Sequence, residues 1–159
     1  MSFLKIFIFS LTLVTGITAT AQRRNTTKTL PPAKFKPPKL TTSLGDYKDT
    51  ALLPVQEAAQ VIGLPLKVTD AKNDVFTISS YNFLYRQIVT TEDDSLNGKP
   101  SYTTATKSAL FKSTPLPRIW LNVITETPRP GEEYIFFDVI AKDAQGRVMY
   151  APNMKLTLK

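Results

Sequence analysis

The 159-residue chain contains neither cysteine nor histidine. Without cysteine there are no disulfides, thiol nucleophiles or thiolate metal ligands, so stability has to come from packing. Without histidine the chain lacks the commonest metal ligand, the usual general base and the Ser-His and Cys-His nucleophile pairs. The sequence also has no glycine-rich phosphate loop and no nucleophile elbow. We therefore expect a protein that is not an enzyme, with no catalytic residue, no cofactor and no metal site.

Long apolar runs are scarce, and the one that stands out lies at the N-terminus. Lys5 precedes an apolar stretch over Ile6–Ile17, and Ala19-Thr20-Ala21 has the small-x-small pattern of a cleavage site. These features predict a signal peptide over residues 1–21 and a mature chain that begins at Gln22. No later run approaches the ~20 apolar residues of a membrane-spanning helix. We expect an exported protein with no transmembrane segment after cleavage.

The formal net charge of +7 is unevenly distributed. Residues 22–40 carry six basic residues and no acidic one, and they are rich in threonine and proline, which favours an extended linker. Residues 41–159 contain 13 basic and 13 acidic residues, so this part of the chain is neutral. We therefore expect a basic, Pro-rich linker over 22–40, a single domain over 41–159 and no binding to nucleic acid.

The domain should contain strands and two short helices. Apolar spacing and end signals predict helices over 52–62, with Val55, Ala58, Ala59 and Ile62 on one face, and over 115–125. Strands are expected over 75–89, 103–112, 133–142, 147–150 and 154–159, with a hairpin-type connection over 90–101 that turns at Asn97-Gly98. The predicted fold class is α+β, with a mainly antiparallel sheet and the two helices covering one side.

Three of these strands have informative patterns. In the first, the apolar phase shifts at Ser79-Ser80, which predicts a β-bulge or else a strand buried on both faces. The stretch 133–142 is apolar at both parities, so we expect it at the centre of the sheet, covered on both faces. Leucine and methionine alternate with lysine and threonine over 154–159, which is typical of a half-exposed or edge strand.

Two groups of carboxylates are the only candidates for acid chemistry. Glu92-Asp93-Asp94 is the densest cluster and has oxygen ligands suited to calcium, but its spacing favours a solvated turn. Glu132 and Glu133 are adjacent, so on a strand they point to opposite faces and do not converge on one substrate. We expect that pair to keep the strand end soluble.

The aromatic residues give a candidate binding site. Tyr81, Tyr85 and Arg86 resemble an aromatic and basic strip that stacks sugars or bases, although the same rings, with Phe83, also make an ordinary core face. We expect Trp120 to pack in the core from the apolar face of its helix.

Two short motifs suggest modification. Thr50 and Ser95 each lie in an Asp-(Ser/Thr)-apolar triplet, a pattern of bacterial O-glycosylation, and are candidate glycan sites.

The order of segments resembles a known family. It runs from Phe35-Lys36-Pro37-Pro38 through a helix ending at Gly63, a Phe-x-Ile-Ser-x-Tyr-x-Phe strand (76–83), Leu110-Phe111, a second helix, Pro130-Gly131-x-x-x-Ile-x-Phe-x-x-Ile (130–140) and Gly146-Arg147. This order is similar to that of the C-terminal periplasmic domain of the GldM (PorM) family, the shaft protein of gliding motility and type IX secretion. The likeness covers about residues 35–159.

The resemblance implies a function but brings no catalytic motif. It implies a non-enzymatic, periplasmic protein-binding module that docks onto envelope proteins, such as the outer-membrane-associated ring components of the secretion machine, as a monomer or a homodimer. The family's transmembrane helix and further periplasmic domains are replaced here by the predicted leader and linker, so we expect an accessory docking module in place of a motor shaft. The alternatives are an extracellular location and an adhesin-like domain that binds glycans or surfaces through Tyr81, Tyr85 or Tyr102.

Overall fold

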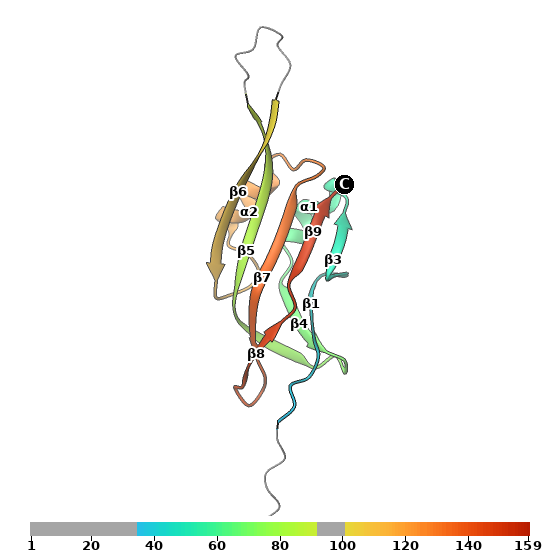
Figure 1. Cartoon of the computed structure of the whole chain (residues 1–159), viewed down its shortest axis with the longest axis vertical. Coiled ribbons are helices and arrows are strands. Elements are labelled where there is room, and N and C mark those ends of the chain that lie inside the picture. Colours follow the sequence, from blue (N-terminus) through green and yellow to red (C-terminus); the bar gives the residue numbers. More distant parts are fainter. Residues whose placement is uncertain (1–34, 92–100) are drawn as a thin grey trace, which may run out of the picture. The chain divides into compact units, whose positions relative to one another are not determined.

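Most of the described chain is β-structure (Figure 1). The computed structural model describes residues 35–91 and 101–159, and Phe35–Lys159 forms one compact unit. The strands are β1 (Leu40–Leu44), β2 (Tyr47–Lys48), β3 (Thr50–Leu53), β4 (Leu66–Asp70), β5 (Val75–Thr91), β6 (Ser101–Phe111), β7 (Glu133–Lys142), β8 (Val148–Ala151) and β9 (Met154–Leu158). The helices are α1 (Val55–Ile62) and α2 (Arg118–Thr125). No helix in the described ranges is long and apolar enough to cross a membrane.

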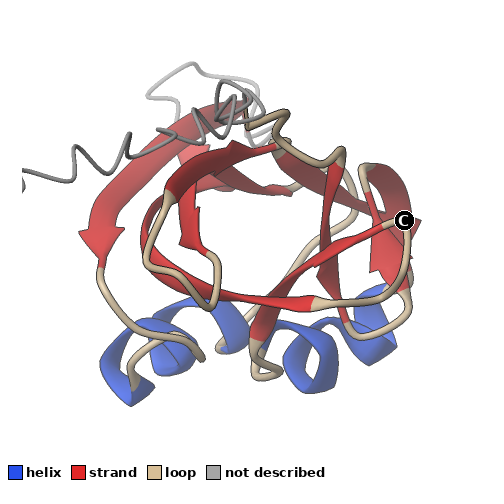
Figure 2. Cartoon of the chain, turned by 90° about the horizontal axis from the view of Figure 1, so that it is seen from below, coloured by secondary structure: helices blue, strands red, loops and turns tan. Residues whose placement is uncertain are grey.

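The strands form one sheet that curls into a nearly closed barrel, with both helices on one side (Figure 2). Their order is β2-β1-β4-β5-β7-β9-β3, while β6 pairs with β5 and β8 pairs with β7. All pairs are antiparallel except β3 with β9. This arrangement confirms the predicted α+β class with a mainly antiparallel sheet.

Two compensating bulges bend the long strand β5 and its neighbour β7. Between the pairs Ile78↔Ala141 and Ser80↔Ile140, β5 has one extra residue, and between Ser80↔Ile140 and Asn82↔Phe137 the extra residue is in β7. Each bulge changes whether the even- or the odd-numbered residues of its strand face the core. In β5 the even-numbered Phe76 is buried before the bulge, whereas the odd-numbered Tyr81, Phe83 and Tyr85 are buried after it. The bulge that we predicted at Ser79-Ser80 is confirmed.

The same geometry corrects the prediction for β7. This strand has neighbours on both sides, as expected, but its two faces differ: Tyr134, Phe136, Val139 and Ala141 are buried, and the residues between them are half-buried or exposed. Asp138 has a positive φ of 50°, and it marks the switch from even to odd inward residues. The bulge therefore places buried residues at both parities, and the outward-facing Ile135, Phe137 and Ile140 are apolar as well, although they are only half-buried.

The N-terminal part of the domain differs most from the expected elements. β1 to β4 were not predicted, and Leu52 and Leu53 belong to β3, so α1 begins only at Val55, after Pro54. Its buried residues are Ala58, Val61 and Ile62, so Val61 takes the place that we expected for Ala59. Of the two alternatives for β9, alternating half-exposure is confirmed, whereas an edge position is excluded because both β7 and β3 pair with this strand.

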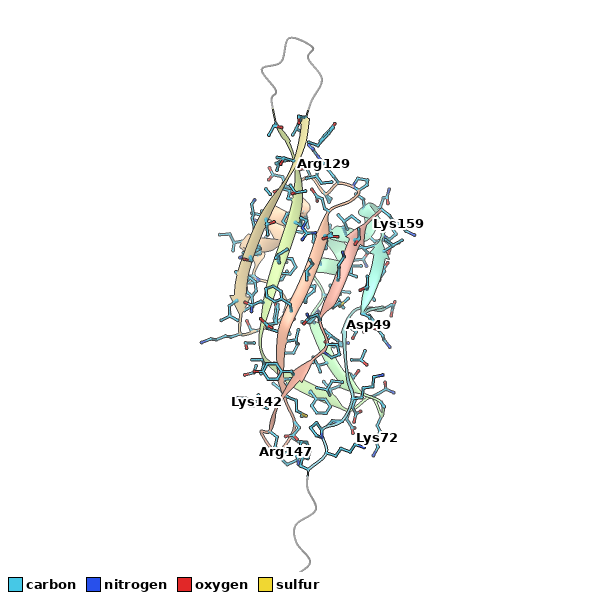
Figure 3. The ribbon with its side chains drawn as sticks, viewed as in Figure 1. Asp49, Lys72, Arg129, Lys142, Arg147 and Lys159 are labelled. Carbon is cyan, nitrogen blue, oxygen red and sulfur yellow. The ribbon has the colours of Figure 1, made fainter. Side chains whose placement is uncertain are left out.

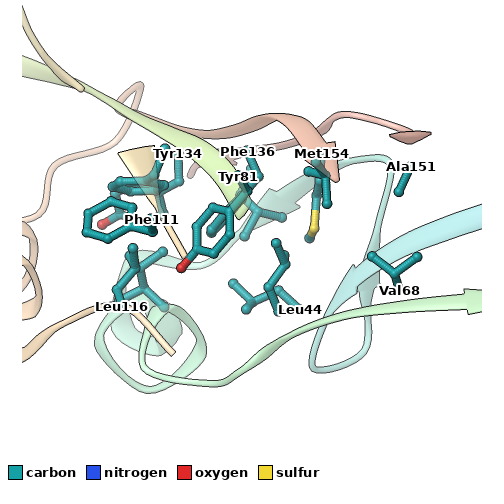
Figure 4. Close-up of a cluster of buried hydrophobic side chains, with 14 of the residues drawn as sticks. Leu44, Val68, Tyr81, Phe111, Leu116, Tyr134, Phe136, Ala151 and Met154 are labelled. Atoms are coloured by element: carbon teal, nitrogen blue, oxygen red, sulfur yellow. The ribbon is translucent and has the colours of Figure 1, made fainter. Parts of the chain in front are cut away.

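The core fills the interior between the strands and the helices (Figure 4). Aromatic rings dominate its centre, where the Phe83 ring lies 5.0 Å from that of Phe136. Trp120, on α2, packs edge-on against Phe83 and Phe111 at centroid distances of 5.8 and 5.6 Å. This contact confirms the predicted packing role of Trp120 and fixes α2 against the β5–β6 hairpin.

Candidate functional site

The predicted aromatic strip does not reach the surface. Tyr81 and Tyr85 are 0% and 1% exposed, because their side chains point from β5 into the core. Of the three residues only Arg86 has an exposed side chain. The Tyr81 hydroxyl donates a hydrogen bond to the Ser113 carbonyl oxygen at 3.2 Å. Burial raises the pKa of Tyr81 to about 12. A sugar or base cannot stack on rings in this position, so the two tyrosines act as core residues.

Glu132 is buried, which corrects its expected role at a soluble strand end. Its side chain is 0% exposed, and its carboxylate accepts hydrogen bonds from the Tyr85 hydroxyl at 2.7 Å and from the Ile88 N–H at 3.1 Å. Burial and then this hydrogen bond raise the pKa of Tyr85 far above its usual value. A buried charge needs such donors. The two hydrogen bonds also tie the start of β7 to β5.

Tyr134 is the third member of this buried group. Its hydroxyl is buried and has no hydrogen-bond partner within the described part of the chain. Burial and the nearby Glu132 charge raise the pKa of Tyr134. The ring lies 5.5 Å from that of Tyr85. These groups face the core, and none of them lines one of the surface hollows described below.

Glu133 points outward, so the expected divergence of the two glutamates is confirmed. It forms ion pairs with Arg86 at 2.5 Å and with Lys155 at 2.6 Å, which link β5, β7 and β9 across the outer face of the sheet. Among the described residues there is no group of three acidic side chains able to hold a metal ion. Glu92-Asp93-Asp94, Ser95 and the predicted turn at Asn97-Gly98 lie outside the described residues, and Thr50 is exposed on β3.

A hollow of about 420 Å³ lies between β6 and α2. Lys107 and Ser108 line it from β6, and Ile119, Trp120 and Val123 line it from α2. Ile119 is 73% exposed, although it is one of the largest apolar side chains on the helix. A hollow lined by apolar side chains and a lysine is suited to an apolar side chain next to an acidic group.

The strand that borders this hollow has a free edge. β6 is paired with β5 along its whole length, from Ser101 to Phe111, and no described strand pairs with its other side. The pattern of β6 predicted a strand but gave no sign of this free edge. Residues 101–125 contain three basic residues, Lys107, Lys112 and Arg118, and no acidic one. The hollow and the edge together form the candidate site, which we call the β6–α2 surface.

Two other areas of the described surface lie outside this site. The outer face of β7 presents the half-buried Ile135, Phe137 and Ile140. The exposed Tyr150 of β8 lies opposite Ile140, and the exposed Leu110 of β6 lies on the far side of β5. A hollow of about 440 Å³ at the other end of the domain contains Asp70, Asp74 and Asp143. The carboxylates of Asp70 and Asp143 accept hydrogen bonds from backbone N–H groups of their own turns, which is a structural role.

No protein-family model matches the chain, and no curated protein matches it either.

Proposed function

We propose that the chain is a non-enzymatic, exported protein-interaction module that docks onto components of an envelope machine in the periplasm. The observation that carries the proposal is the β6–α2 surface, where a free strand edge adjoins an apolar hollow. Proteins usually pair, cover or interrupt such an edge, because unpaired backbone groups attract other strands. An exposed isoleucine beside it adds an apolar contact.

The resemblance to the GldM (PorM) family supports the choice of machine. In the Pro130-Gly131 motif that carries the likeness, Ile135, Phe137 and Ile140 lie on the outer face of β7, and they are half-buried in the isolated domain. The matched positions therefore include residues on the surface of the domain, and not only residues that specify its fold. The partners that we propose are the outer-membrane-associated ring proteins of the type IX secretion and gliding apparatus.

A pull-down from cross-linked source cells tests the proposal. The exported chain, tagged after Lys159, should enrich ring components of the secretion machine over a tagged exported control domain. Recovery of unrelated surface proteins or of glycans, without ring components, would contradict docking to this machine.

The second candidate function is glycan or surface binding by an adhesin-like domain. Of its three candidate rings only Tyr102 is available, since it is 65% exposed on β6 while Tyr81 and Tyr85 are buried. Binding of the purified chain to a glycan array, lost in Tyr102→Ala, would favour this alternative. Binding that is absent, or unchanged by the substitution, would count against it.

A further inference from the structure

We propose that the β6–α2 surface takes up an extended, acidic segment of the partner as an additional β-strand. This inference rests on the proposed function and deepens it, because it names the surface and the chemistry of the partner. The segment would pair with the free edge of β6, place an apolar side chain in the hollow beside α2 and bring a carboxylate to Lys107.

The first support is the edge itself. β6 has 11 residues, none of them proline, so each residue has a backbone N–H and a C=O. In an antiparallel pair these groups point alternately toward the partner strand and away from it, so about half of the β6 groups face the free side. An extended peptide can satisfy them with main-chain hydrogen bonds, the usual source of affinity in strand addition.

The second support is the position of the hollow. Lys107 and Ser108, near the middle of β6, line it from the strand, and α2 forms the opposite wall. Side chains alternate along an added strand, so one of the two faces of the segment would look toward α2. Ile119, Trp120 and Val123 offer an apolar contact to such a side chain. This contact gives the strand addition a preferred register.

The third support is the charge, which also discriminates between occupants. Residues 101–125 carry only positive charges, so an acidic segment is attracted and a basic one repelled. A second copy of the chain is a poor occupant, because it would bring the same positive charges to the edge. In an antiparallel pair of two β6 strands centred on Thr106, for example, both Lys107 side chains would lie on one face, in diagonal cross-strand positions. Like charges in such cross-strand positions are destabilising. We therefore infer a different protein, with an acidic residue in its segment.

Selection of random twelve-residue peptides displayed on phage against the purified chain tests this inference. We expect the enriched peptides to alternate apolar and polar residues and to include Asp or Glu. Lys107→Glu should weaken the binding of a selected synthetic peptide at least tenfold, and Lys107→Arg should retain it. The matched control is Lys72→Glu, in the β4–β5 turn far from β6 (Figure 3), which should change affinity less than twofold.

N-methylation of the peptide backbone provides a readout that does not alter the protein. Methyl groups on alternate residues of one phase should abolish binding, while the same groups on the other phase should leave it nearly unchanged, because only one phase faces β6. Amide resonances of Ser101–Phe111 should shift on binding. Equal effects of both phases, peptides without acidic residues, shifts on other strands, or no enrichment would each overturn the inference.

The failure of this inference is distinguishable from failure of the proposed function. A photo-crosslinking residue at Ser108 should capture a ring component in source cells, whereas one at Lys72 should not. Capture of the ring component from Lys72 and not from Ser108 would retain the docking function and reject the β6–α2 surface. Loss of capture at every tested position, together with a negative pull-down, would reject the function itself.

Discussion

The three Tyr→Phe substitutions at positions 85, 134 and 150 should change stability in three different ways, although each removes only one hydroxyl. In Tyr85→Phe the Glu132 carboxylate loses its 2.7 Å donor while it stays buried. Hydrogen bonds to charged groups contribute about 1.5–3 kcal/mol, so we expect the free energy of unfolding to fall by about 2 kcal/mol.

Tyr134→Phe should have the opposite sign. The Tyr134 hydroxyl is buried without a partner among the described residues, so folding removes it from water with no compensating bond. Its removal should raise the free energy of unfolding by about 1 kcal/mol, at the low end of the cost of burying an unsatisfied polar group. Tyr150, which is 76% exposed, is the matched control, and its substitution should have an effect within about 0.5 kcal/mol.

Urea unfolding of the purified chain, followed by tryptophan fluorescence and by circular dichroism, measures all three. With a slope of about 1–3 kcal/mol per molar urea, the expected loss in Tyr85→Phe lowers the midpoint by about 1 M. The reasoning would be refuted if Tyr134→Phe were destabilised as much as Tyr85→Phe, because the hydroxyl would then have a partner such as a buried water molecule.

Three further predictions concern alkaline pH, β7 and modification. Burial raises the pKa values of Tyr81, Tyr85 and Tyr134, so their protons stay bound in the folded state above pH 10, where the unfolded chain releases them. The free energy of unfolding should therefore fall above about pH 10, by up to about 1.4 kcal/mol per pH unit for each tyrosine. Absorbance at 295 nm should show that these tyrosines ionise only on unfolding. Asp138→Val should cost about 1–2 kcal/mol because φ is positive there, whereas Asp138→Gly should stay within about 0.5 kcal/mol; equal losses in urea would contradict the bulge argument. If Thr50 and Ser95 carry O-glycans, the intact mass of the chain from its source will exceed that of the bare 22–159 polypeptide, whereas the variant with both changed to alanine will have the mass of its own bare polypeptide; an unmodified mass of the unsubstituted chain would dismiss both sites.

The sequence predicted the elements whose pattern reflects one dominant environment. The alternation of Met154, Leu156 and Leu158 identified β9, and the phase shift at Ser79-Ser80 located the bulge in β5. Helix α2 was found from its apolar spacing, although it begins at Arg118, directly after Pro117, and not at residue 115 as predicted. In each case the local pattern and the tertiary packing favour the same structure.

The missed elements are those in which tertiary contacts override a weak local pattern. β1 buries Thr42 and Ser43, which resemble loop residues in the sequence, and the Thr42 hydroxyl donates to the Pro152 carbonyl oxygen at 2.6 Å. That partner is 110 residues away, so no local signal could indicate it. In β7 a signal was present, because Asp138 interrupts an apolar run, but we attributed the run to burial on both faces.

Glu132 shows why the chemistry of a site is harder to predict than its strand. Adjacent glutamates at a strand end are usually solvated, and Glu133 follows that rule with its ion pairs to Arg86 and Lys155. Glu132 departs from it because the donors that satisfy it, Tyr85 and Ile88, lie on a strand more than 40 residues earlier. Only the register of β5 with β7 brings these groups together.

The free edge of β6 depends on topology in the same way. Its threonine- and alanine-rich sequence predicts a strand, but whether that strand has one neighbour or two is decided by the path of every other strand. Lys107 is the single charge among its 11 residues. A lone lysine discourages pairing between identical edges, yet it leaves room for a partner with the opposite charge. A long edge protected against its own copy but open to an acidic strand is what a module selective for one partner requires.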